Sequence, residues 1–280
     1  MHLNSTVKLL ATDLDGTLLR SDKSISELDW NSLERLAEAG IVRVAATGRS
    51  LFKVREVLSL DAPFDYVVFS SGAGIYDWKN QQLLISEHFE KQVVNDLMRY
   101  LVLLGFNFFV FRPIPQNNLF WFHKGAGSCH EYESYLKRHE GDYLELTEAE
   151  YPREAGQIMI VIANHDGYVN RVIDEVYMAH DGVKVIRATS PLNPDFTWLE
   201  IFPKTVSKGH GIAWLCSLLN IDPKHTIGIG NDYNDSDMFD FVEFPFLLKN
   251  GVEALKEHCH FIDLTNNESA VAAVVSSLNL

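Results

Sequence analysis

The feature that most constrains the fold is an alternation of strand-like and helix-like segments at both ends of the chain. Before residue 71, strands are predicted at 7–12, 41–46 and 66–70, with helices at 27–39 and 51–58. The alternation resumes with strands at 196–201, 226–229 and 245–248 and helices at 208–219, 236–240 and 269–277. Strands that alternate with helices pair in parallel. The two ends are therefore predicted to form one layered α/β domain.

The middle of the chain has a different pattern, which predicts a second domain. It combines a short hairpin, aromatic-rich strands and helices near 90–104, 128–138 and 168–179. This is an α+β pattern with mixed or antiparallel pairing. A length of 280 residues also exceeds the usual size of one hydrophobic core. The predicted domains are residues 1–85 with 191–280, and residues 86–190.

Two aspartates stand two residues apart after the first predicted strand, in the motif Asp13-Leu14-Asp15-Gly16-Thr17. Side chains on an extended segment alternate between faces, so both carboxylates point the same way and can converge on one metal ion or one phosphorus atom. The alternative is a plain turn, because Asp-Gly is common where a strand stops. An EF-hand is excluded, because it needs a third ligand before its glycine and a final glutamate.

Three further polar groups follow strands of the predicted parallel sheet. They are Thr47-Gly48-Arg49, Lys208 and the loop 230–235. Each has a structural alternative, as a helix start or an Asx-turn loop, although a lysine opposes the dipole at a helix N-terminus. Open α/β sheets bind ligands beyond the carboxyl ends of their strands. Together the four groups supply a nucleophile, a proton donor, oxygen ligands and phosphate-binding donors, the requirements of phosphoryl transfer.

On these motifs the chain resembles, over essentially its whole length, a haloacid dehalogenase-like phosphatase of the Cof type, subfamily IIB. The resemblance implies a Rossmann-like parallel-sheet core and an α+β cap inserted between the second and third motifs. The spacing agrees with this, because 34 positions separate Asp13 from Thr47 whereas 161 separate Thr47 from Lys208. Only the second interval has room for a lid that excludes water and grips the leaving group.

The resemblance also implies the roles of individual residues. Asp13 would form an aspartyl-phosphate, and Asp15 would protonate the leaving oxygen and then activate water. Thr47 and Lys208 match the catalytic hydroxyl and lysine of the family. Mg²⁺ would be held by Asp13, by the backbone carbonyl of Asp15 and by the acidic loop. The expected metal ligands are Asp13, Asp15, Asn231, Asp232 and Asp235, and the expected substrate-binding residues are Thr47, Gly48, Arg49, Ser71, Lys208 and Asn234.

Two positions depart from the family pattern. The fourth motif is usually Gly-Asp-x-x-Asn-Asp, but here Asn231 stands where the metal-binding aspartate is expected. Asparagine offers a carbonyl oxygen without a charge, so Asp232 or Asp235 could supply part of the missing negative field. At 70–73 the chain reads Ser-Ser-Gly-Ala, where relatives commonly show Asn-Gly-Ala, which leaves the role of Ser71 open.

The expected function is Mg²⁺-dependent hydrolysis of small phosphate monoesters, such as sugar phosphates or related metabolites. A phosphosugar mutase of the same superfamily is one alternative, although the middle of the chain shows no dense arginine cluster for a bisphosphate intermediate. A non-catalytic module that senses a phosphorylated metabolite is another, and only Asn231 favours it.

Charge and cysteine content limit the partners and the location. A net charge of −14 repels nucleic acid and anionic lipid at long range. The three cysteines are widely separated and one is left over if two pair, which favours a reducing cytoplasm. Neither a secretory leader nor a run of 18 apolar residues is present, so neither secretion nor membrane insertion is expected. We expect a monomer or a weak homodimer.

Overall fold

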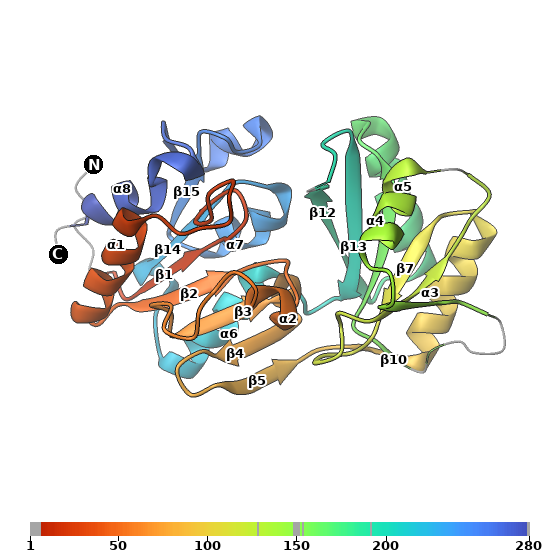
Figure 1. Cartoon of the computed structure of the whole chain (residues 1–280), viewed down its shortest axis with the longest axis horizontal. Helices are drawn as coiled ribbons and strands as arrows, with labels where there is room; N and C mark the ends of the chain where they lie inside the picture. Colours follow the sequence, from red (N-terminus) through yellow and green to blue (C-terminus); the bar gives the residue numbers. More distant parts are fainter. Residues whose placement is uncertain (1–6, 128, 148–151, 153, 191, 279–280) are drawn as a thin grey trace. The chain divides into compact units, whose positions relative to one another are not determined.

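The computed structural model describes residues 7–127, 129–147, 152, 154–190 and 192–278. These residues form two compact units (Figure 1). The first unit is assigned to Met1–Ile85 with Ser207–Leu280, and the second to Ser86–Val206. Of the helices in the described ranges, none is both long enough and apolar enough to cross a bilayer.

The first unit is built on an eight-stranded sheet whose central strands are parallel, as the alternating sequence pattern predicts. The strand order is β16-β15-β14-β1-β2-β3-β4-β5. The parallel strands are β1 (Leu9–Thr12), β2 (Val42–Ala46), β3 (Tyr66–Phe69), β14 (Thr226–Gly230), β15 (Phe244–Leu248) and β16 (His260–Ile262). The edge is formed by β4 (Gly74–Asp77), antiparallel to β3, and β5 (Gln82–Ser86). This confirms the predicted α/β fold class.

β1 is the central element of this sheet for function. All four of its residues are buried, and it pairs with β2 on one side and β14 on the other. Its neighbours therefore come from opposite ends of the sequence, so the strand order reverses direction at β1. Loops that leave neighbouring parallel strands at such a switch point diverge and create a crevice for ligands.

Helices cover the sheet and determine the positions of the loops that join them to its strands. The helices of the first unit are α1 (Glu27–Glu38), α2 (Leu51–Val54), α6 (Lys208–Leu219), α7 (Ser236–Phe241) and α8 (Ala270–Ser276). Side chains of α6 and α7 share one core with apolar residues of β1, β2 and β3. α1 begins after Ser26, whose Oγ accepts a hydrogen bond from Asp29 N (3.0 Å), and it packs against α8 (Figure 1). The helix predicted at 51–58 is shorter, because the chain after Val54 continues as turns.

Short 3₁₀ turns complete the first unit and shape its loops. They are η1 (Ser70–Gly72), η3 (Pro223–His225), η4 (Tyr233–Asp235), η5 (Glu253–His258) and η6 (Asn266–Glu268).

The second unit is an α+β layer. Its main sheet has the order β12-β13-β11-β7-β8-β9 and is antiparallel except where β8 meets β9. The strands are β7 (Phe108–Phe111), β8 (Phe120–His123), β9 (Tyr143–Glu145), β11 (Gln157–Ala163), β12 (Val183–Thr189) and β13 (Phe196–Pro203), with β6 (Phe89–Glu90) and β10 (Glu154–Ala155) in a separate pair. The helices are α3 (Lys91–Leu103), α4 (His130–Arg138) and α5 (Asp166–Ala179).

The two faces of this second sheet carry separate cores. Phe108 packs with α3 and α5, whereas the next residue, Phe109, packs with Tyr132 and Tyr135 of α4. This follows from the alternation of side chains along a strand. The aromatic residues of β7 are therefore core residues of the second unit.

The boundary between the units differs from the predicted one. Residues 191–206 were assigned to the first domain, but β13 pairs over its length with β12 and with most of β11 in the second sheet, and the first unit resumes only at Ser207. The apolar pattern of 196–201 correctly predicts a strand. It does not specify the partner, because a short apolar run fits a buried strand in either kind of sheet.

Close packing of α6 on β3 gives a testable prediction. A Cβ on Gly211 would lie 2.6 Å from Val68 Cγ1. Helix propensity favours alanine by about 1 kcal/mol, but overpacking a core costs about 1–3 kcal/mol. We therefore expect Gly211→Ala to lower the free energy of unfolding, measured by urea denaturation. As a control, Gly167→Ala in α5, where no atom lies within 4 Å of the new Cβ, should be neutral or stabilising; an equal effect of both variants would contradict this explanation.

Candidate active site

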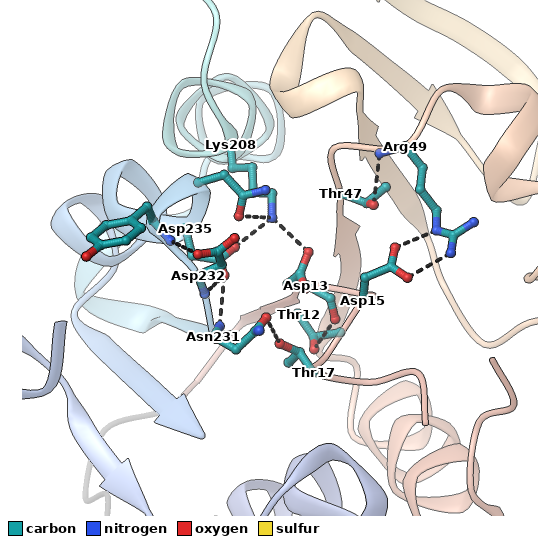
Figure 2. Close-up of polar contacts among 12 residues, drawn as sticks. Thr12, Asp13, Asp15, Thr17, Thr47, Arg49, Lys208, Asn231, Asp232 and Asp235 are labelled. Carbon is teal, nitrogen blue, oxygen red and sulfur yellow. Dashed lines mark hydrogen bonds and ion pairs between the residues drawn. The ribbon is translucent and has the colours of Figure 1, made fainter. Parts of the chain in front are cut away.

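The site lies in the first unit, at the carboxyl ends of its central strands. Asp13 follows β1, Thr47 follows β2, and Ser71 lies in the turn after β3. The 231–235 loop follows β14, and Lys208 is the first residue of α6. Figure 2 shows Asp13, Lys208 and Asp235 pointing toward one another from three of these segments. The structure thus brings together residues that are up to 222 positions apart in the sequence.

Lys208 is the centre of a buried ion network. Its Nζ donates to Asp13 Oδ1 (2.7 Å), to Asp235 Oδ1 (2.6 Å) and to Asn234 Oδ1 (3.2 Å). Lys208 and Asp235 are fully buried, and Asp13 is 4% exposed. The two carboxylates explain how a lysine is tolerated at the N-terminus of α6, where the helix dipole opposes a positive charge.

Burial and neighbouring charges shift the pKa values of Asp13 and Lys208 in opposite directions. Burial raises the pKa of Asp13 to about 7, although the neighbouring Lys208 ammonium acts to lower it. Burial acts to lower the pKa of Lys208, but the carboxylates of Asp13 and Asp235 outweigh burial and raise that pKa. Lys208 therefore stays protonated near neutral pH, the range to which burial brings the pKa of Asp13.

Asp235 organises the loop that follows β14. Its Oδ2 accepts hydrogen bonds from the backbone N–H groups of Asn231 (2.8 Å) and Asp232 (3.0 Å), while its Oδ1 accepts from Lys208. Asp232 completes a capping box with Asp235 at the start of η4. Both oxygens of Asp235 therefore serve to shape the loop and to neutralise Lys208.

Asn231, the departure from the family pattern, packs against the first motif. Its Oδ1 accepts a hydrogen bond from Thr17 Oγ1 (3.0 Å). A Cβ on Gly16 would lie 2.7 Å from Asn231 Nδ2, and Gly16 has a φ of +76°. A glycine is therefore required at position 16, both for its conformation and for the close approach of the amide.

The donors near Asn231 fit a magnesium ion by their chemistry. Within the described ranges, no three His, Cys, Asp or Glu side chains form a group that could hold a metal. The set that the family resemblance implies is mixed: the Asp13 carboxylate, the Asp15 backbone carbonyl and the Asn231 amide oxygen, all hard oxygen ligands. Mg²⁺ is commonly bound through only one or two carboxylates and keeps several waters. The set therefore suits Mg²⁺, with less negative charge than an aspartate at 231 would give.

Asp15 lies in a different environment from Asp13. Its carboxylate accepts a pair of hydrogen bonds from Arg49, Nε to Oδ2 (2.5 Å) and Nη2 to Oδ1 (2.7 Å), and a third from Lys23 Nζ to Oδ1 (2.8 Å). Figure 2 shows this carboxylate turned toward Arg49. Burial acts to raise the pKa of Asp15, but the hydrogen bonds and charges of Arg49 and Lys23 outweigh it and lower that pKa. Asp15 is therefore an ionised carboxylate here.

Backbone hydrogen bonds join the second motif, Thr47-Gly48-Arg49, to the turn after β3. Ser71 N donates to Thr47 O (3.0 Å), and Ser70 N donates to Arg49 O (2.8 Å). Ser71 Oγ lies 3.4 Å from where a Cβ on Gly48 would be, and Asn234 Nδ2 lies 3.7 Å from it. Ser70 and Ser71 have φ values of +48° and +55°, a left-handed conformation that asparagine tolerates better than serine. Gly48, Ser71 and Asn234 thus meet at one point beside Lys208.

Two contributors to the site were not predicted from the sequence. Lys23 reaches Asp15, and Asn250 Nδ2 donates to the backbone carbonyl of Gly16 (2.8 Å). Both lie in irregular loops that carry no strand or helix pattern, so the sequence alone gave no signal for them. A polar residue in the short segment between the first motif and α1 is the only clue that could have pointed to Lys23.

Comparison with known proteins agrees with this geometry. The model of the haloacid dehalogenase-like hydrolase family matches residues 10–275. The chain is 24% identical to 5-amino-6-(5-phospho-D-ribitylamino)uracil phosphatase YwtE of Bacillus subtilis, over 97% of this chain and 98% of YwtE.

Solved structures share the fold. TM0651 from Thermotoga maritima superposes with a TM-score of 0.71 at 24% identity, covering 98% of each chain. The subclass IIB sugar phosphatase BT4131 superposes with a TM-score of 0.73 at 16% identity, covering 96% of this chain and 98% of BT4131. The family resemblance inferred from the motifs is confirmed, and the chain belongs to the haloacid dehalogenase-like hydrolases.

Proposed function

We propose that this protein is a Mg²⁺-dependent phosphatase that hydrolyses small phosphate monoesters through an aspartyl-phosphate on Asp13. The observation that carries the proposal is the buried Asp13–Lys208–Asp235 network at the carboxyl end of β1, beside Thr47 and Asn234. In this proposal Asp13 is the nucleophile, Lys208 is the fixed cation, and Thr47 and Asn234 are the neutral donors. Those are the parts that phosphoryl transfer from a monoester requires.

In the first half-reaction, a carboxylate oxygen of Asp13 attacks phosphorus as the bond to the leaving oxygen breaks. Lys208 balances the charge of the nucleophile and of the phosphoryl oxygens, with Thr47, Gly48, Ser71 and Asn234 as the binding groups around them. Asp15 gives its proton to the leaving oxygen. In the second half-reaction, Asp15 takes a proton from water, which attacks phosphorus and frees Asp13.

Arg49 acts in both half-reactions through Asp15. Its guanidinium holds both oxygens of Asp15, and with Lys23 it favours the ionised form. The ionised carboxylate is the form that accepts a proton from water in the second step. An incoming phosphate brings negative charge close to Asp15, and this charge favours return of the proton to Asp15 before the first step.

The metal would be held by Asp13, by the Asp15 backbone carbonyl and by Asn231. Asp232 and Asp235 would contribute negative charge from the same loop. When bound, Mg²⁺ would screen the repulsion between the Asp13 carboxylate and the phosphate dianion.

The substrate is proposed to be a small phosphorylated metabolite, with the second unit as a cap that selects the leaving group. The relative YwtE is named for a phosphorylated ribityl compound and BT4131 for sugar phosphates, which supports a polyol or sugar phosphate. The net charge of −14 disfavours nucleic acid, and the three free cysteines suit a cytoplasmic protein. We propose a monomer or weak homodimer.

The first test is hydrolysis of a panel of phosphate esters with Mg²⁺. Asp13→Asn should lower phosphate release by at least about a thousandfold, because an amide cannot form the acyl phosphate. The wild-type protein quenched during turnover should carry one acid-stable phosphoryl group on Asp13, detected by mass spectrometry. Phosphate release by Asp13→Asn at the wild-type rate would refute the proposal, and isomer formation without free phosphate would point to a mutase.

The second test concerns the asparagine in the fourth motif. Asn231→Asp restores a charged ligand and should lower the Mg²⁺ concentration for half-maximal activity by about tenfold, since Mg²⁺ affinity rises with ligand charge. Calorimetric titration with Mg²⁺ should show the same shift in the absence of substrate. Asp232→Asn is the matched control for charge in the same loop. If Asp232→Asn weakens Mg²⁺ binding and Asn231→Asp leaves it unchanged, Asp232 and not Asn231 holds the ion.

The third test uses the raised pKa of Asp13. Because burial lifts this pKa from about 4 in the unfolded chain to about 7 in the fold, the folded protein binds more protons between these values. The stability contributed by Asp13 is therefore full below pH 4 and is lost as the pH rises through 7. In EDTA, the unfolding free energy of the wild type minus that of Asp13→Asn should fall from pH 4 to pH 7. A constant or rising difference would mean that the Lys208 ion pair outweighs burial.

A further inference from the structure

Lys23 has a backbone conformation that lysine rarely adopts. Its φ is +69°, in the left-handed region that favours glycine and asparagine. It occupies the third position of a tight loop closed by hydrogen bonds from Arg20 N to Ser24 O (2.9 Å) and from Lys23 N to Arg20 O (2.9 Å). In three-residue loops of this kind the left-handed position is usually glycine. A lysine here therefore requires an explanation.

The loop around Lys23 is anchored by a distant part of the chain. Ser21 N donates to Asn267 Oδ1 (3.0 Å), and Asn267 Nδ2 donates to Ser21 Oγ (3.0 Å). Within the loop, Ser24 N donates to Asp22 Oδ1 (2.9 Å). These contacts hold the backbone on either side of Lys23 in place.

The side chain of Lys23 ends on Asp15, the proposed acid and base. Lys23 Nζ and Arg49 Nη2 both donate to Asp15 Oδ1, at 2.8 Å and 2.7 Å. Lys23 is 53% exposed and Asp15 is 38% exposed in this pair. An exposed pair adds little to stability, so stability does not account for a strained lysine. Strain of this kind is typical of functional positions.

The contacts also distinguish the two oxygens of Asp15. A carboxylate can accept about four hydrogen bonds, two on each oxygen. Among the described residues, Oδ1 accepts from two donors, Lys23 and Arg49, whereas Oδ2 accepts from Arg49 Nε alone. Oδ1 is thus filled, and Oδ2 keeps a free acceptor position.

We propose that Lys23 is a positioning residue that, together with Arg49, holds Asp15 so that Oδ2 exchanges the proton with the leaving oxygen and with water. This inference rests on the proposed phosphatase function. Lys23 acts by fixing the orientation of the Asp15 side chain, and it touches neither the phosphate nor Asp13.

The test compares Lys23→Asn and Lys23→Arg with the wild type. Asparagine removes the ammonium group but suits the left-handed backbone, so the melting temperature of Lys23→Asn should be unchanged or higher. Its kcat/KM for phenyl phosphate should fall about tenfold, a part of the 10²–10⁴-fold effect of general acid catalysis. For p-nitrophenyl phosphate, whose leaving group needs little protonation, kcat/KM should fall less than twofold by the same reasoning. Lys23→Arg should retain most of the phenyl phosphate activity.

A matched control is Lys224→Met. Lys224 forms another exposed pair, with Asp222 at 2.9 Å, just before β14 begins and so at the end of that strand away from the site. Lys224→Met should leave kcat/KM unchanged for both phenyl phosphate and p-nitrophenyl phosphate. The inference would be overturned if Lys23→Asn lowered kcat/KM equally for both esters, or if it did not lower kcat/KM for phenyl phosphate.

A structural measurement separates this inference from the proposed function. If the wild type hydrolyses neither ester with Mg²⁺, the phosphatase proposal fails, and a crystal structure of Lys23→Asn then decides the role of Lys23. An Asp15 side chain rotated away from Arg49, or present in two orientations, supports the positioning role. An unchanged Asp15 overturns it.

Discussion

The structure of the first unit depends on one interaction, the contact of the buried Lys208 ammonium with the carboxylates of Asp13 and Asp235. A charge without access to water must be paired, and removing one partner of such a network costs about 3–5 kcal/mol. The three residues come from the ends of β1 and β14 and the start of α6. The pairing of these charges therefore joins the first motif to the last third of the chain. Because Asp235 also binds the backbone of its own loop, the same interaction sets the shape of the candidate metal site.

The two aspartates of the first motif show how one short sequence can supply two chemical roles. Asp13 is buried beside a lysine, and burial raises its pKa. Asp15 is partly exposed, and two cations lower its pKa in spite of burial. Pairs of acids whose environments push their pKa values apart are typical of acid–base and nucleophilic catalysis. The spacing of two residues gives both side chains the same general direction, and the surrounding loops give them different environments.

Much of the candidate site could be predicted from the sequence because its residues follow strands. The rule that ligands bind at the carboxyl ends of parallel strands selected Asp13, Thr47 and the loop after β14 without any knowledge of contacts. Lys208 was selected by the same rule on the assumption that 196–201 belongs to the parallel sheet, whereas Lys208 follows β13 of the second unit. The rule could not select Lys23, which lies in an irregular turn, nor show that both oxygens of Asp235 are used within the site. Hydrogen bonds of single side chains depend on distances that no sequence pattern encodes.

The sequence by itself determined the α/β class of the first unit, since alternating strand and helix patterns leave a covered parallel sheet as the compatible arrangement. It also determined that the middle of the chain differs, and that two acids stand at the end of β1. Only the tertiary structure decided where the second unit ends, because 196–203 joins β11 and β12 through backbone hydrogen bonds that any buried strand could make. It likewise decided the environments of Asp13 and Asp15. Strand patterns reflect burial, which is local to each residue, whereas pairing partners and electric fields depend on segments that are distant in the sequence.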